Sequence, residues 1–176
     1  MLSTSLFWIL LAVMVFWAVG AYNRLARLRS AVIQAFGGLD VCLVRMMALP
    51  GECAAAADMS ATAKAPQWQL LQAAATQFGA SLAVARANPL QADAAAALST
   101  ALQVLCAAWG TLAPSGAEAG TRPGATWAQQ WSHLQMQRNQ AQELFNRAVL
   151  QYNDSQAQFP ARMLAGAFGF KPGRTL

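Results

Sequence analysis

The strongest constraint on this chain is its first 23 residues, which contain no charged side chain. Within them, an apolar run extends from Leu6 to about Tyr22. As a helix rising about 1.5 Å per residue, this run is roughly 25 Å long, enough to cross a slightly thinned bilayer. Trp8, Trp17 and Tyr22 occupy positions that suit the two membrane interfaces. We therefore predict a transmembrane anchor over residues 1–22.

A cleaved signal peptide is the alternative interpretation of this run. Signal peptides carry a basic residue ahead of the apolar stretch, and here no Lys or Arg precedes Leu6. The small residues Val19, Gly20 and Ala21 would suit a cleavage site. The missing basic residue favours an uncleaved anchor.

Three arginines, Arg24, Arg27 and Arg29, follow the apolar run directly. Basic residues beside a span stay on the cytoplasmic side, and anionic lipid headgroups reinforce this by about 1 kcal/mol per basic side chain. We therefore predict a single-pass protein with its N-terminus outside and everything after Asn23 in the cytoplasm.

The overall composition excludes a densely basic nucleic-acid binder. The net charge is +5, but only 11% of residues are charged and 56% are hydrophobic, whereas such binders crowd Lys and Arg on one face. Alanine supplies much of the apolar content and favours helix, while β-branched residues show no strand-like alternation. Cys42, Cys53 and Cys106 are odd in number and lack C-x-x-C spacing. We interpret them as buried, reduced thiols.

Beyond the anchor, apolar residues recur at three- and four-residue steps, which indicates helices. The first helix is expected to continue to Leu49 and to end at Pro50-Gly51, with Gly37-Gly38 permitting a bend or close packing. A second covers residues 52–87, with a kink or a new start at Pro66. A third is expected from a capping box at Asn88-Pro89-Leu90-Gln91 to about Leu112.

Residues 113–125 form a loop by composition, and Thr126 is expected to cap a fourth helix. This helix carries the most regular apolar seam, from which Gln142 is absent; the seam comprises Trp127, Trp131, Leu134, Arg138, Ala141, Phe145, Ala148, Tyr152, Ser155 and Phe159. Such a seam packs either within the chain or in a coiled coil between chains. Arg138 in the seam requires a partner or a hydrated edge.

The predicted fold is all-α: a transmembrane helix continuing into an antiparallel four-helix bundle of long helices over residues 23–160. Residues 161–176 form an apolar and basic tail. A short apolar segment with a basic fringe suits the membrane interface; its candidate residues are Arg162, Phe168, Phe170, Lys171 and Arg174. A lid over the end of the bundle is the alternative, and the two are not exclusive.

Catalytic chemistry has few candidate groups. His133 is the only histidine, and the seven acidic residues are scattered. A carboxylate metal site in a bundle needs Glu-x-x-His pairs, and the glycine-rich "AGAFGF" does not match a phosphate-binding loop. We therefore predict no catalytic, metal or cofactor site, and a protein that is not an enzyme.

Two stretches of the sequence resemble the LemA family. Residues 22–45, "YNRLARLRSAVIQAFGGLDVCLVR", resemble the family's opening, and residues 144–172, "LFNRAVLQYNDSQAQFPARMLAGAFGFKP", resemble its ending. The "RMMALPGE" stretch departs from the family's turn after the first helix, and the 113–125 loop is longer than the family's. The motif residues are Tyr22, Asn23, Asp40, Asn146, Tyr152, Asn153, Phe159, Pro160, Gly166, Gly169 and Pro172.

This resemblance implies a single-pass protein of the bacterial inner membrane with a cytoplasmic helical bundle and no known catalytic residues. We expect a non-catalytic scaffold or adaptor that contacts anionic lipid headgroups and a membrane or cytoplasmic protein, with self-association as a further option and no nucleic-acid partner. The alternatives are an exported accessory of a membrane protease or other membrane enzyme, facing the periplasm, or a membrane-organising relative of the magnetosome type.

Overall fold

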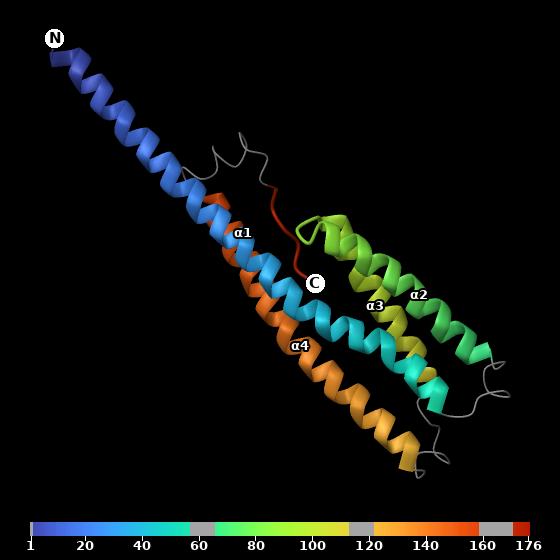
Figure 1. Cartoon of the computed structure of the whole chain (residues 1–176). Helices are drawn as coiled ribbons and strands as arrows, with labels where there is room; N and C mark the ends of the chain where they lie inside the picture. Colours follow the sequence, from blue (N-terminus) through green and yellow to red (C-terminus); the bar gives the residue numbers. More distant parts are fainter. Residues whose placement is uncertain (1, 57–65, 113–121, 159–170) are drawn as a thin grey trace.

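The structure, a computed structural model, describes residues 2–56, 66–112, 122–158 and 171–176 (Figure 1). These residues form four helices: α1 (Leu2–Ala56), α2 (Pro66–Ala87), α3 (Ala92–Leu112) and α4 (Arg122–Ala157). No strand occurs within these ranges. The prediction of an all-α fold is confirmed.

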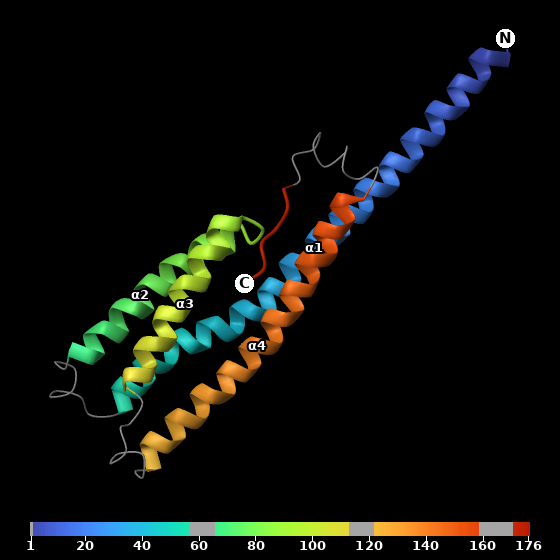
Figure 2. The same ribbon diagram turned by 180° about the vertical axis from the view of Figure 1, so that it is seen from behind.

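The helices pack as two pairs. α1 lies along α4, α2 lies along α3, and a narrower contact between α1 and α2 joins the pairs. Figures 1 and 2 show this arrangement from opposite sides. The predicted packing of the helices as a bundle is therefore confirmed.

All four helices contribute to one hydrophobic core. Between α1 and α4, the Phe36 and Phe145 rings meet edge to face with centroids 5.8 Å apart. Between α3 and α4, Trp109 stacks on Trp131 with centroids 4.6 Å apart. The predicted seam of α4 thus packs inside the chain, so its heptad pattern does not require a coiled coil between chains.

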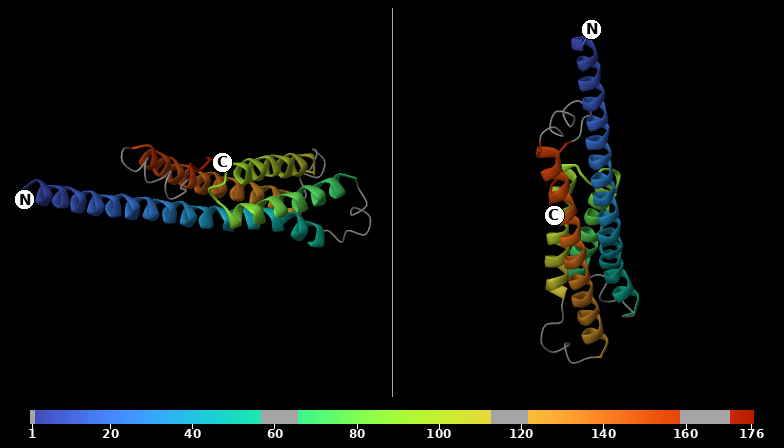
Figure 3. Two further views of the ribbon diagram at one scale, coloured as in Figure 1. Left: turned by 90° about the horizontal axis from the view of Figure 1, so that it is seen from above. Right: turned by 90° about the vertical axis from the view of Figure 1, so that its left-hand side faces the viewer.

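The N-terminal part of α1 projects beyond the other helices (Figure 3). No side chain from Ser5 to Arg24 is buried, and Leu25 is the first that is. α1 and α3 are both long and apolar enough to cross a membrane, but 33% of the apolar window of α3 is buried in the fold and none of that of α1 is. The N-terminus is thus a long apolar helix with the length and composition of a membrane span or a signal sequence.

The structure corrects the predicted end of the first helix and decides between the two alternatives predicted at Pro66. α1 does not end at Leu49 but continues through Pro50 to Ala56. A proline inside a helix removes one hydrogen bond, and the alanines that follow favour helix strongly, so the last turn persists. α2 begins at Pro66, which confirms a new start there, because the first helical position needs no N–H partner.

The predicted helix caps are wrong. Asn88–Gln91 form a turn in which Asn88 N–H donates to the Val84 carbonyl, and Gln91 carbonyl accepts from Ala95. Asn88 therefore closes α2, and Gln91 opens α3. α4 begins at Arg122 rather than Thr126, since Pro123 is tolerated in a first helical turn.

The expectation of close packing at Gly37-Gly38 is also wrong. A Cβ atom built at either glycine would meet no other atom within 4 Å. Both residues are exposed, and α1 runs through them without a break. Close packing against another element is therefore excluded at both glycines, and the bend that they permit stays a prediction.

Candidate functional site

Residues 171–176, which we call the tail segment, lie between α4 and the turn that joins α2 to α3 (Figures 1 and 2). The tail segment packs most tightly against its neighbours at Gly173. A Cβ atom there would come within 2.7 Å of Leu90 Cδ2 and 3.2 Å of Val149 Cγ1. Since Val149 is buried and has one preferred rotamer in a helix, this position accepts no bulkier residue without displacement.

Two asparagines on α4 hold the backbone of the tail segment. Asn153 Nδ2 donates to the Gly173 carbonyl at 2.8 Å, and its Oδ1 accepts from Gly173 N–H at 2.9 Å. Asn146 repeats the pattern on Leu176, with distances of 3.0 Å and 2.9 Å. Each amide side chain thus satisfies one donor and one acceptor of the same residue. We call this pair the asparagine clamp.

The spacing of the clamp matches the geometry of an extended chain. The asparagines are seven residues apart, which on an α-helix places them on one face about 10.5 Å apart. Gly173 and Leu176 are three residues apart, about 10 Å in an extended backbone. The agreement fixes the register of the tail segment on α4.

Two further side chains complete the contact. Gln142 Nε2 donates to the Leu176 carbonyl at 2.6 Å. Gln142 lies outside the apolar seam of α4, so the sequence pattern did not indicate this structural role. The Tyr152 hydroxyl donates to the Lys171 carbonyl at 3.3 Å. Burial raises the pKa of Tyr152, against a smaller lowering by Arg29. The phenol therefore keeps the proton that it donates at neutral pH.

The structure places only part of the predicted tail. Lys171, Pro172 and Arg174 are exposed, while Leu176 packs against the core. The remaining predicted tail and motif residues lie outside the described ranges: Phe159, Pro160, Arg162, Gly166, Phe168, Gly169 and Phe170. Contact of the apolar tail with lipid therefore stays a prediction.

The predicted membrane-flanking residues lie where the bundle begins. Arg24, Arg27 and Arg29 are all exposed, as are Tyr22 and Asn23. They surround Leu25, the first buried side chain of α1. The three arginines therefore stand at the boundary between the projecting apolar helix and the packed bundle.

Asp40, one of the motif residues, forms an ion pair with another helix. Arg86 of α2 donates from Nε and Nη2 to the two carboxylate oxygens of Asp40, at 2.8 Å and 3.0 Å. The bond and charge of Asp40 raise the pKa of the Arg86 guanidinium. This pair spans the narrow contact between the two helix pairs, but it is open to solvent.

We expect Asp40→Asn to destabilise the protein only slightly, because exposed ion pairs are weak and screened by salt. The same substitution in an Arg86→Gln background should have a smaller effect, and the coupling should disappear at high salt. Urea unfolding of the four proteins of this double-mutant cycle measures it. Unchanged coupling in 1 M salt would refute the surface-pair interpretation.

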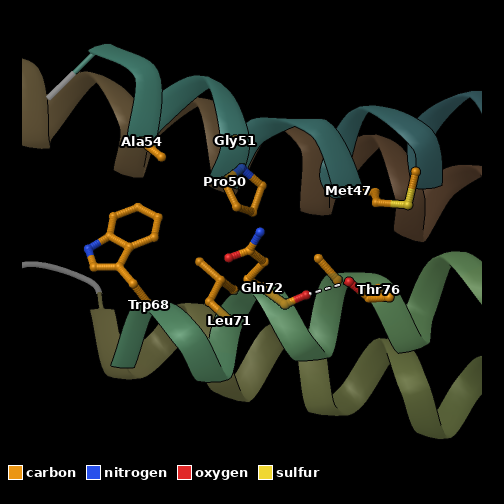
Figure 4. Close-up of a pocket in the computed structure, with 9 residues that line it drawn as sticks. Met47, Pro50, Gly51, Ala54, Trp68, Leu71, Gln72 and Thr76 are labelled. Carbon is orange, nitrogen blue, oxygen red and sulfur yellow. Dashed lines mark hydrogen bonds between the residues drawn. The ribbon is translucent and has the colours of Figure 1, made fainter. Parts of the chain in front are cut away.

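A cavity of about 390 Å³ lies between the end of α1 and the start of α2 (Figure 4). Pro50 and Trp68 face it from the two helices, with Met47 and Leu71 beside them. Thr76, at its far end, donates to the Gln72 carbonyl within α2. The lining is mostly apolar and carries no charged group.

The other candidate groups do not assemble into a reactive site within the described ranges. His133 is exposed and lies 2.9 Å from the Gln137 amide nitrogen. Cys42, Cys53 and Cys106 are free thiols, as predicted, but half-buried rather than fully buried. In those ranges no three His, Cys, Asp or Glu side chains lie close enough to hold a metal ion.

No family model matches this chain, and neither do any curated proteins or solved structures.

Proposed function

We propose that this chain is a LemA-like, single-pass protein of the bacterial inner membrane whose helical bundle acts by contact, as a scaffold or adaptor. The observation that carries the proposal is the abrupt change along α1. Its apolar side chains are exposed up to Tyr22, including Phe16 at 83%, and burial begins at Leu25. A run of exposed apolar side chains of this length is costly in water and suits a lipid environment.

An uninterrupted helix links the anchor to the bundle, which supports a rigid attachment. α1 continues from Leu2 to Ala56 without a break, so its orientation in the membrane sets that of the bundle. At about 1.5 Å per residue it is roughly 80 Å long, far more than a bilayer requires. The length of α1 beyond Leu25 lies within the bundle, which is thereby held beside the lipid in a fixed orientation, as a scaffold needs.

We propose an antiparallel order of the helices. The connection between α2 and α3 consists of residues 88–91 alone. So short a turn leaves no length for the chain to return to the start of α2, which favours opposite directions in this pair. The length of α4, 36 residues, suits a return along α1 toward the anchor.

The LemA proposal draws support from the contacts of its motif residues. Asn146, Tyr152 and Asn153 hold the tail segment, and Asp40 joins α1 to α2. Motif residues that serve the fold in this way would recur for structural reasons, without a catalytic role. The proposed partners are anionic lipid headgroups near the three arginines and a membrane or cytoplasmic protein that the bundle recruits.

We expect replacement of Arg24, Arg27 and Arg29 by Ser to give mixed membrane orientation without unfolding the bundle, because their side chains are exposed. Impermeant labelling of both ends of the chain, with circular dichroism of the purified variant, measures the two effects. Replacement of the exposed Arg147 by Ser is the matched control. A single, unchanged orientation in the triple variant would contradict the charge argument.

Recruitment of a protein partner is a separate part of the proposal. Cross-linking in native membranes would test it.

A further inference from the structure

The structure contains a second cavity, of about 310 Å³, at a different place from the one in Figure 4. It lies between α1, α3 and α4, with Leu176 of the tail segment on one side. Arg138, the one charged residue in the predicted seam of α4, lines it. Binding sites for small molecules begin at about this size.

The walls of this cavity differ in polarity. α1 supplies leucines, α3 supplies leucines together with Ser99 and Gln103, and α4 supplies amide and guanidinium groups. The apolar lining residues are Leu39, Leu43, Leu98 and Leu102. The polar ones are Ser99, Gln103, Gln135, Arg138 and Gln142. A cavity with an apolar wall on α1 and polar groups on the other two helices suits an amphipathic ligand.

The guanidinium of Arg138 is incompletely satisfied. Its Nε is buried and has no hydrogen-bond partner, and its Nη2 donates to the neighbouring Asn139 side chain. Within the described ranges, the carboxylates in ion pairs are those of Asp40 and Glu143, which are joined to Arg86 and Arg147. A buried N–H donor without a partner costs free energy even where the rest of its half-buried guanidinium reaches solvent, and an arriving anion would remove that cost.

We propose that this cavity binds a small amphipathic carboxylate, such as a medium-chain fatty acid, with its head group on Arg138 and its alkyl chain against the leucines. A carboxylate can accept from Nε and a terminal nitrogen of one guanidinium at the same time. Gln135 adds an amide donor on the same wall. The tail segment forms part of the enclosure, because the Leu176 carbonyl is held by Gln142.

Cys106 provides a reporter within the cavity. Its thiol lines the site, and burial raises its pKa, partly opposed by Arg138 and Gln135. A ligand on Arg138 therefore shields Cys106 from alkylation. Cys42 and Cys53 do not line the cavity and serve as internal references in the same molecule.

The test measures Cys106 alkylation by peptide mass spectrometry in the full chain, held in nanodiscs of zwitterionic lipid, with and without octanoate. We expect saturating octanoate to slow alkylation of Cys106 by roughly tenfold or more and to leave the two reference cysteines unchanged. Octan-1-ol, which has the same chain length but no charge, should protect far less. Arg138→Gln should raise the octanoate concentration needed by at least tenfold, since charge-assisted bonds are the strong ones.

Arg147→Gln is the matched control, because it removes an exposed cation of the same helix. It should leave protection unchanged. A melting temperature for each variant, without ligand, verifies that the bundle is folded. Equal protection by octanol, or protection that survives in Arg138→Gln, would overturn the proposal in favour of a purely apolar cavity. Absence of protection in the unaltered chain would overturn it altogether.

Discussion

Phe145→Ala should destabilise the folded chain by about 3–5 kcal/mol, the largest effect expected of a single substitution here. Phe145 is fully buried and meets Phe36 across the interface between α1 and α4. Removing the ring loses the free energy gained by its burial and leaves a cavity between α1 and α4. The two helices cannot close this cavity without shifting along their whole contact. Urea unfolding of the full chain in detergent micelles, followed by circular dichroism, measures the loss.

Leu144→Ala is the matched control for this prediction. Leu144 is adjacent in sequence and apolar, but its side chain is 61% exposed. Leu144→Ala should therefore lower the free energy of unfolding far less than Phe145→Ala, because this side chain buries little apolar surface on folding. Similar losses at both positions would contradict the assignment of the buried face of α4.

Asn153→Ala should release the tail segment while leaving the bundle folded. The substitution removes both hydrogen bonds to Gly173, and each such bond contributes about 1 kcal/mol net, so amide exchange at Gly173 should rise by roughly tenfold to a hundredfold. Asn146→Ala should act in the same way on Leu176. Hydrogen exchange resolved over residues 171–176 gives the readout, and the melting temperature should change far less than for Phe145→Ala.

Two substitutions sharpen the test of the asparagine clamp. Gly173→Val leaves both asparagines in place but introduces branched atoms against Leu90 and Val149, so it should give the same faster exchange. Gln140→Ala, at an exposed position of α4, should leave exchange unchanged. Protection that persists in Asn153→Ala would show that the tail segment is held by its packing and not by the clamp.

The sequence predicted the elements governed by periodic patterns. The seam of α4 placed Trp131, Phe145 and Tyr152 correctly in the core, because a heptad repeat fixes which face of a long helix is apolar. The new start at Pro66 also followed from local chemistry. In both cases the information lies within a few helical turns.

Contacts between distant parts of the chain could not be predicted in this way. The asparagine clamp joins α4 to residues 20 and 30 positions away along the chain. Polar residues at i and i+7 carry no pattern that distinguishes such a clamp from a solvated helix face. The same holds for Gln142, which lies off the seam yet donates to Leu176. The predicted helix end at Pro50 and the predicted helix start at Thr126 were misplaced. Ending or starting a helix a few residues away changes the free energy little, because alanine-rich turns extend a helix easily and proline is tolerated in a first turn.

The central claim is that the apolar part of α1 crosses the membrane and holds the bundle on the cytoplasmic side. Single cysteines at position 3, ahead of the apolar run, and at the exposed Gln140 report the two sides. Each is exposed to a membrane-impermeant maleimide in intact spheroplasts and again after permeabilisation, with the parent chain as the baseline for the half-buried native thiols. The account predicts labelling of position 3 in intact spheroplasts and of position 140 only after permeabilisation. Labelling of position 140 in intact spheroplasts would contradict it.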